Sequence, residues 1–174
     1  MKILQVNTMD KEGGAAVVAR NLFEAYRQRG HDSYFVVGNK QSKDENVYQI
    51  PDLSLNTYLK KLENKYKGIW HVRGCVKAIH KKRMTFEQNQ GWENFHFPGS
   101  RHILELPPKK PDIVHLHNLH GGYFDLRYIP KLSKKKPVVM TLHDMWMLSG
   151  HCASSLGCER WQTGCGECPD LSLY

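Results

Sequence analysis

The sequence has no long hydrophobic run. No stretch approaches the roughly 18 to 20 apolar residues of a membrane-spanning helix, and the first residues turn polar too soon for a secretory signal peptide. We therefore expect a cytoplasmic protein with a globular core, since 40% of the 174 residues are hydrophobic and 24% are charged. Thiols stay reduced in that compartment, so clustered cysteines are expected to bind metal or to react rather than to form a disulfide framework.

The motifs of several common protein classes are also missing. No serine lies in a nucleophile elbow, which argues against a hydrolase triad. The pair Gly13-Gly14 belongs neither to a six-position dinucleotide fingerprint nor to a Walker phosphate loop. The chain has no internal repeats and no low-complexity tract, and its length is about that of one domain.

Acidic residues are scarce in one segment. Between Thr57 and Met84 there are nine lysines and arginines and only one acidic residue, Glu63, while the rest of the chain has 16 of each sign. Apolar residues recur there every three or four positions, which predicts a basic amphipathic helix that Gly68 and Gly74 divide. Such a helix can lie on an anionic membrane surface, or it can be a solvated helix packed on its own domain.

The other segments alternate between strand and helix patterns. Short apolar runs predict strands at residues 2–7, 33–37, 113–117 and 138–142. Apolar residues from Ala15 to Tyr26 share one helical face, and a shorter helix is expected over residues 126–134. This alternation is typical of an α/β fold with a parallel sheet. We take residues 1–174 as one such domain, with the basic helix as an insertion at about residues 55–85.

Three of the predicted strands turn polar at their carboxyl ends. The first ends at Asn7, the middle one at His117-Asn118 and the last at His143-Asp144. Ligands of an open parallel sheet bind in the crevice outside these ends. We therefore expect the polar side chains to converge on one cleft; the alternative is that each marks an ordinary transition from strand to loop.

Residues at these ends have candidate roles. Gly13 and Gly14 precede the first helix, whose free N–H groups and positive end favour a phosphate, although a tight turn would use the same residues. His143 is the strongest candidate for catalysis. Its imidazole could donate to an anionic or hydroxyl group while Asp144 fixes its tautomer or contacts a sugar hydroxyl. The alternative is a structural histidine at a turn.

Two further histidines share one face of their strand. His115 and His117 are two positions apart, so the period of a strand points both side chains the same way. Two imidazoles can form part of a metal site, but no carboxylate partner lies nearby in the sequence. Hydrogen bonding or packing near the cleft is therefore the preferred interpretation.

The segment at residues 149–169 holds most of the cysteines. They follow the pattern C-x5-C-x6-C-x2-C, with His151 as a spare ligand, at Cys152, Cys158, Cys165 and Cys168. A structural zinc ion requires four such ligands in a tetrahedron, and the two-residue spacing of the last pair lets both sulfurs face one ion. Packed thiols, an oxidised pair and a redox site are the alternatives, although a redox Cys-x-x-Cys usually opens a helix.

Three stretches together resemble a known family: "GGAAVVARNLFEAYRQRGHDSYFVV", "DIVHLHNLHGGYFDLRYIPKLSKKKPVVMTLHDMW" and "SGHCASSLGCERWQTGCGECPDL". In order and spacing they are similar to the amino-terminal domain of family-4 glycosyltransferases of the GT-B type. Bacterial enzymes of capsule, exopolysaccharide and colanic-acid-type synthesis are the most similar. The third stretch is the most specific, and residues 38–110 contribute little.

The resemblance implies a Rossmann-like domain that holds the acceptor and faces a second, donor-binding domain outside these 174 residues. By matched positions, Gly13 and Gly14 resemble the loop near the diphosphate of a nucleotide-sugar donor, and His143 resembles the histidine that contacts the transferred sugar. Such enzymes transfer with retention, need no metal for the chemistry and often dock on membranes to reach lipid-linked acceptors. The chain alone is expected to be inactive, because the leaving diphosphate would lack most of its charge stabilisation.

A second interpretation stays open. A basic helix together with a cysteine cluster also occurs in noncatalytic metal-knuckle modules that bind nucleic acid or protein. The cysteine segment lacks the paired knuckles of a zinc finger, and the basic helix lies far from it in the sequence. We therefore favour the transferase, with a nucleotide sugar and a saccharide or lipid-linked acceptor as partners and no nucleic acid.

Overall fold

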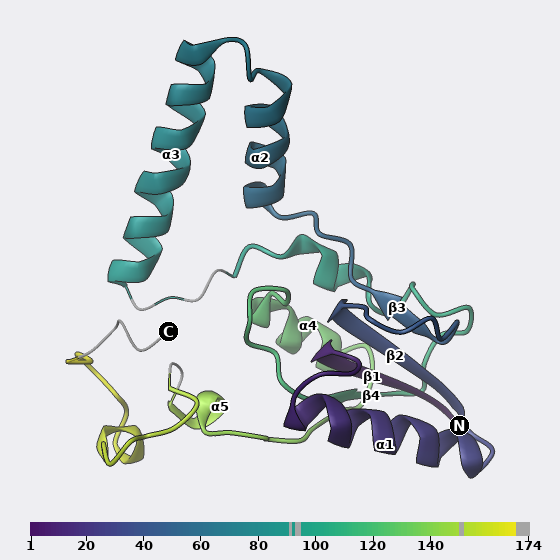
Figure 1. Ribbon diagram of the computed structural model, residues 1–174. Coiled ribbons are helices and arrows are strands. Elements are labelled where there is room, and N and C mark those ends of the chain that lie inside the picture. Colours follow the sequence, from purple (N-terminus) through teal and green to yellow (C-terminus); the bar gives the residue numbers. More distant parts are fainter. Residues whose placement is uncertain (91, 93–94, 150–151, 170–174) are drawn as a thin grey trace. The chain divides into compact units, whose positions relative to one another are not determined.

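A computed structural model describes residues 1–90, 92, 95–149 and 152–169 (Figure 1). The chain forms two compact units. The first consists of Met1–Asp52 and Phe97–His143, and the second of Leu53–His96 and Asp144–Tyr174. Among the described residues, no helix is long and apolar enough to cross a membrane.

The first unit is built on a five-stranded sheet in the order β3-β2-β1-β4-β5. Its strands are β1 Lys2–Met9, β2 Asp32–Asn39, β3 Val47–Gln49, β4 Ile113–Leu116 and β5 Val138–Met140. All four pairings are parallel. This confirms the predicted α/β, Rossmann-like parallel sheet. The sequence analysis missed β3, which is only three residues long and has too few positions to show a period.

Helix α1, Gly14–Gln28, runs along β1 and β2 and supplies much of the core (Figure 1). Phe23 of α1 lies on Phe35 of β2, with 5.7 Å between the ring centroids, and neither side chain is exposed. Ala19, Val37 and Val47 complete this cluster. Burying each large apolar side chain contributes about 1.5 to 3 kcal/mol. The helix ends at Gln28, and Gly30, where the sequence analysis expected the end, follows the cap residue Arg29 with a φ of 77° that suits glycine.

The face of the sheet that α1 covers changes character from one strand to the next. Phe35 of β2 is the register partner of Gln5 in β1, and Gln5 is in turn the partner of His115 in β4. Register partners in a parallel sheet, and residues two apart in a strand, share a face. The face is therefore apolar under α1 and polar from Gln5 across to His115, which places the histidines on the same side of the sheet as α1.

The second unit contains a helical hairpin, α2 Leu55–Lys65 and α3 Trp70–Asn89 (Figure 1). The Ser54 side chain caps α2 by accepting a hydrogen bond from the backbone N–H of Thr57 at 3.2 Å. Gly68 lies between the helices, as expected, but the predicted break at Gly74 is wrong because Gly74 lies inside α3. A glycine inside a helix costs about 1 kcal/mol relative to alanine, which contact between α2 and α3 can offset.

Short helices complete the two units. The helix expected over residues 126–134 is a 3-10 turn, Leu126–Tyr128, followed by α4, Ile129–Ser133, with Pro130 in its first turn. A second 3-10 turn, Pro98–His102, belongs to the same unit. The second unit holds α5, Trp146–Ser149, and a 3-10 turn at Arg160–Gln162.

Replacing Gly38 with alanine tests the packing behind the loop that follows β4. A Cβ atom at Gly38 would lie 2.5 Å from Cγ of the Tyr123 ring, closer than such atoms approach. Because Tyr123 is a buried side chain in that loop, Gly38→Ala is expected to lower the free energy of unfolding by about 1 to 3 kcal/mol. Urea denaturation measures the change. Gly14→Ala is the matched control, since no atom lies within 4 Å of its Cβ position; equal losses in both variants would contradict this packing.

Candidate functional site

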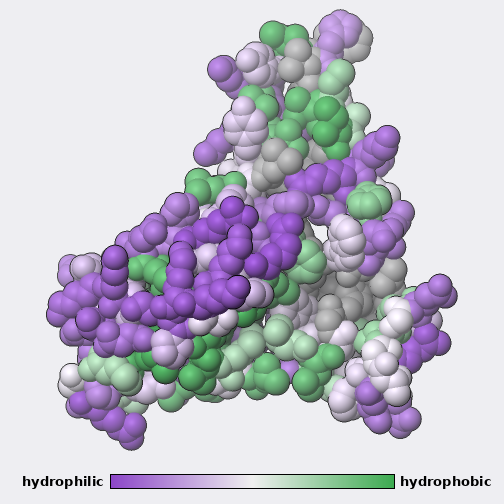
Figure 2. Space-filling view, turned by 180° about the vertical axis from the view of Figure 1, so that it is seen from behind, coloured by the Kyte–Doolittle hydropathy of each residue, from purple (hydrophilic) through white to green (hydrophobic). Residues whose placement is uncertain are grey.

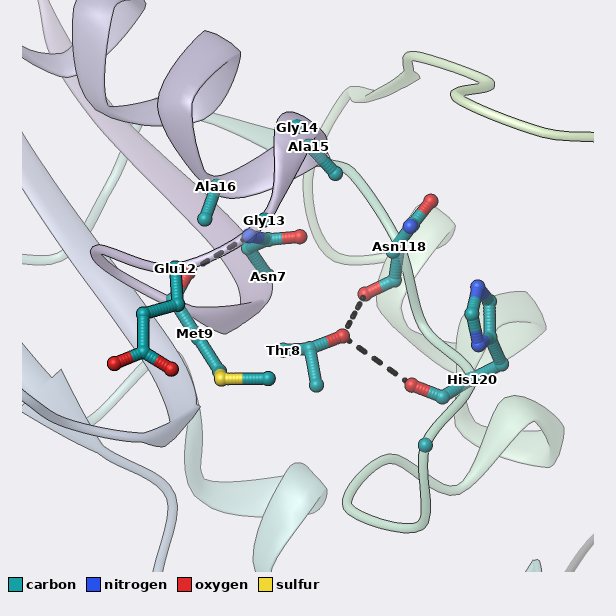
Figure 3. Close-up of a pocket in the computed structure, with 11 residues that line it drawn as sticks. Asn7, Thr8, Met9, Glu12, Gly13, Gly14, Ala15, Ala16, Asn118 and His120 are labelled. Atoms are coloured by element: carbon teal, nitrogen blue, oxygen red, sulfur yellow. Dashed lines mark hydrogen bonds between the residues drawn. The ribbon is translucent and has the colours of Figure 1, made fainter.

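A pocket of about 320 Å³ opens at the carboxyl end of the sheet (Figure 3). Three elements line it: the end of β1, the first turn of α1 and the loop after β4. Asn7, Gly13, Gly14 and Asn118 are all among its lining residues, so the structure brings together four of the predicted binding residues. Convergence of polar strand ends at one place is what a parallel sheet requires.

Hydrogen bonds hold the two loops of the pocket together. The Asn7 side-chain amide donates to the Met9 carbonyl at 2.7 Å, which shapes the turn that leaves β1. The Thr8 hydroxyl lies 3.3 Å from the carbonyl oxygens of both Asn118 and His120 and can donate to either (Figure 3). The Tyr123 hydroxyl also donates to the Asn118 carbonyl, at 2.5 Å. The wall of the pocket at Asn118 is therefore fixed before any ligand binds.

The first turn of α1 lines the pocket, and its first backbone N–H groups have no partner within the helix. Gly13 has a φ of 91°, a conformation that favours glycine, and its carbonyl accepts the first helical hydrogen bond, from Val17, at 3.1 Å. The N–H groups of the three residues before Val17 thus have no partner within the helix. No side chain caps this end and its first turn has no acidic residue. The carboxylate of Glu12, another lining residue, points away from Asn118 and His120 (Figure 3). Oxygen atoms of an anionic or hydroxyl-rich ligand suit such an end.

A chain of hydrogen-bonded polar side chains runs from Gln5, in the middle of β1, to the histidines that follow β4 and β5. The Gln5 amide nitrogen is 3.2 Å from Nε2 of His117, and Nδ1 of His117 is 2.9 Å from Nε2 of His143. The His117 and His143 rings are stacked, with 5.2 Å between centroids. His115 lies beside His117 at 4.3 Å between centroids and bonds through Nε2 to the Thr141 hydroxyl at 2.7 Å. Both histidines are thus hydrogen-bonded and packed on a neighbouring ring, and neither is among the residues that line the pocket. The binding role predicted for His117 stays a prediction.

Burial keeps the inner histidines neutral. Burial, helped by the neighbouring His115 and His143, lowers the pKa of His117 to about 3. Burial, and then His143, also lowers the pKa of His115. A neutral imidazole has one donor nitrogen and one acceptor nitrogen, so each ring accepts a hydrogen bond from one neighbour and donates one to the other. The half-buried His143 forms the outer end of this chain.

The other predicted residues have different surroundings. Asp144 belongs to the second unit, where its carboxylate accepts a hydrogen bond from the backbone N–H of Trp146, the first residue of α5, at 3.0 Å. Its catalytic role stays a prediction. In the cysteine segment, the Ser149 hydroxyl accepts from the N–H of Cys152 at 2.9 Å, and the Cys165 thiol donates to the Ser149 carbonyl at 3.2 Å.

The four cysteines do not form a closed metal site in the structure. Among the described residues, Cys152, Cys158, Cys165 and Cys168 form no disulfide, and no three or more histidine, cysteine or acidic side chains gather as metal ligands. The spare ligand, His151, lies outside the described residues. Zinc binding by these residues stays a prediction, which metal analysis of the dialysed protein would test.

Several residues of the site escaped the sequence analysis. Gln5 and Thr141 bond to the histidines, while Thr8 and His120 belong to the pocket. A signal for Gln5 existed: it is a polar residue inside an apolar strand, two positions before Asn7 and therefore on the same face. Thr8 lies near the end of β1, beyond the strand expected over residues 2–7, and His120 lies in the loop after β4, where no period indicates the direction of a side chain.

The low pKa of His117 predicts a dependence of stability on pH. Since the unfolded chain binds a proton near the ordinary pKa of 6.5 and folded His117 does so only near 3, the free energy of unfolding should fall between these values as the pH decreases. The slope for one proton is roughly 1 kcal/mol per pH unit. His117→Asn removes this proton, so urea denaturation from pH 7 to pH 5 should show a shallower slope for the variant. Parallel pH dependences would contradict the buried neutral imidazole.

Comparison with known proteins agrees with this geometry. The model of Glycosyltransferase Family 4 matches residues 12–162. A protein of Escherichia coli (strain K12) named as a colanic acid biosynthesis glycosyl transferase, WcaC, is 32% identical over 181 residues. That match covers 100% of this chain, and the chain spans 41% of the relative's length. No solved structure matches significantly. With a family model that matches most of its length and a parallel sheet like the amino-terminal half of a GT-B enzyme, the chain belongs to glycosyltransferase family 4.

Proposed function

We propose that the chain is the acceptor-side domain of a transferase that moves a sugar from a nucleotide sugar to a cell-surface polysaccharide or its lipid-linked precursor. The observation that carries the proposal is the pocket, in which polar groups from β1, α1 and the loop after β4 converge. A saccharide presents many hydroxyl groups, and backbone N–H groups, amides and imidazoles can bond to them in fixed positions. The name of the Escherichia coli relative supports a polysaccharide pathway.

In this proposal the donor site needs a second domain. The backbone donors at the start of α1 would face the diphosphate of the nucleotide sugar, close to Gly13 and Gly14. His143 would contact the transferred sugar, and Asp144 would act beside it. Transfer would proceed with retention at the anomeric carbon and without a metal ion in the chemistry. Most of the charge that stabilises the leaving diphosphate would come from the second domain.

Replacing His143 tests the proposal in a full-length transferase that contains this domain. His143→Ala removes a hydrogen-bonding imidazole at the reacting sugar, so kcat is expected to fall by roughly 100-fold or more. The matched control is His102→Ala, because His102 is an exposed histidine that bonds to Glu105. Equal activity of the two variants in an assay of sugar transfer would contradict the proposed role of His143.

A second experiment examines the 174-residue chain by itself. Since the proposal assigns most donor contacts to another domain, the chain should bind a nucleotide sugar weakly and show no turnover. Isothermal titration with the nucleotide sugars of common hexoses measures the binding. Tight binding by the chain alone would contradict the assignment as an acceptor-side domain.

We also propose that the helical hairpin docks on an anionic membrane. Large apolar side chains stand exposed on it, Tyr58 by 58%, Ile69 by 50% and Ile79 by 62%. Lysines surround them, and Figure 2 shows hydrophobic and hydrophilic residues side by side on the hairpin at the top of the view. An amphipathic, cationic surface binds anionic lipid by apolar burial together with charge. Docking would bring the domain to a lipid-linked acceptor.

Vesicle sedimentation tests the docking. Lys60→Glu, Lys61→Glu and Lys65→Glu together should reduce binding to vesicles of anionic phospholipid at least tenfold, since each surface lysine contributes about 1 kcal/mol. The same triple change at Lys134, Lys135 and Lys136, in the first unit, alters the net charge equally and is the control. Binding that both triple variants lose alike would indicate general charge attraction rather than a docking hairpin.

A further inference from the structure

The strongest unassigned feature is the buried glutamine behind His117. Gln5 and His117 are both 0% exposed, and Gln5 lies in β1 between Phe35 of β2 and His115 of β4. An apolar side chain would fill this position without the cost of burying an amide. The Gln5 amide uses its nitrogen on His117, while its oxygen has no partner among the described residues. A buried amide with only one of its two polar atoms hydrogen-bonded contributes little to the stability of the fold. A role of Gln5 in orienting the histidines is the alternative.

The hydrogen bonds that link Gln5, His117 and His143 have a definite donor-to-acceptor direction. A glutamine amide nitrogen only donates, so Nε2 of His117 must accept from Gln5. A neutral His117 then carries its proton on Nδ1 and donates to Nε2 of His143. With Nε2 of His143 occupied as an acceptor, a neutral His143 carries its own proton on Nδ1. No described residue bonds to that nitrogen.

We propose that Gln5 is a positioning residue for His143, acting through His117 to hold the ring in place and to keep its proton on Nδ1. His143 therefore offers a hydrogen-bond donor, and the ligand atom that it meets must be an acceptor, such as a hydroxyl or phosphoryl oxygen. The role in sugar transfer rests on the proposed function; the tautomer does not. The low pKa of His117 agrees with this arrangement, because a protonated His117 would donate from both nitrogens and leave no acceptor for Gln5.

Nuclear magnetic resonance of the 174-residue chain tests the direction without any substrate. Long-range correlation of ring protons with ¹⁵N distinguishes a protonated ring nitrogen from a bare one in each histidine. At pH 7 we expect both His117 and His143 to be protonated on Nδ1 and bare on Nε2. A wild-type spectrum with His117 protonated on Nε2 would overturn the proposal, because Gln5 would then be the acceptor and the hydrogen bonds would point from His143 toward Gln5.

The variant Gln5→Met removes the amide at similar volume. Free histidine favours the proton on Nε2, so His117 should change to that tautomer, and His143 should follow because His117 then accepts. The matched control is Ser33→Ala, which removes from the neighbouring strand β2 a buried hydroxyl that has no partner among the described residues, and it should leave both tautomers unchanged. If His143 keeps its proton on Nδ1 in Gln5→Met, the proposal is wrong. Should this variant not fold, the wild-type spectrum still decides the direction.

A double-mutant cycle in the full-length transferase separates positioning from structure. Gln5→Met is expected to lower kcat roughly tenfold to a hundredfold, with little change in KM. In a His143→Ala background the same change should cost nothing further, because its effect passes through His143. An equal loss in both backgrounds would show a structural effect and overturn the proposal. Failure of sugar transfer itself would leave the tautomer result standing, so the two hypotheses can fail separately.

Discussion

The parallel pairing of β1 with β4 decides where every candidate residue lies. Gln5 is aligned with His115, and the backbone N–H of His117 donates to the Val6 carbonyl at 2.9 Å, which extends the alignment past the end of β4. Because side chains alternate between faces, a slip of one residue would turn the polar groups of one strand away from those of the other. The pocket and the histidine chain therefore depend on a register that backbone hydrogen bonds set.

One face of this sheet holds both the apolar core and the buried polar side chains of the candidate site. Under α1 it holds Phe23 and Phe35, whose contact is purely apolar. Toward β4 and β5 it holds imidazoles and an amide, which are costly to bury unless they bond to one another. Burial lowers the pKa of His115 and of His117 and so keeps both rings neutral, which reduces that cost, since a buried positive charge would need an anionic partner.

The sequence was informative where a local pattern determines structure. Period and composition predicted four of the five strands and α1, and the rule for parallel sheets then predicted that Asn7 and Asn118 would meet. Contacts between elements carry no such pattern. In the sequence Gln5 is an isolated polar residue in an apolar strand, and only the pairing with β4 shows that it contacts His117. In the same way, Gly74 predicts a helix break from the sequence alone, whereas α3 continues through it and packs on α2. Position 91, positions 93 and 94, and positions 150 and 151 lie outside the described residues.

A membrane-docking transferase would have to be attracted to anionic lipid and also to select its sugar, and in this chain the positive charge and the polar pocket lie in different segments. The excess of positive charge lies between Thr57 and Met84, and the rest of the chain has 16 residues of each sign. A strongly basic pocket would attract anionic lipid and nucleotide alike. The pocket of this structure instead offers backbone N–H groups, amides and an imidazole. Among its described lining residues Glu12 has the one carboxylate, and none is a lysine or an arginine. Substitutions in the hairpin could therefore change the affinity for a membrane without altering the polar groups that would bind a sugar.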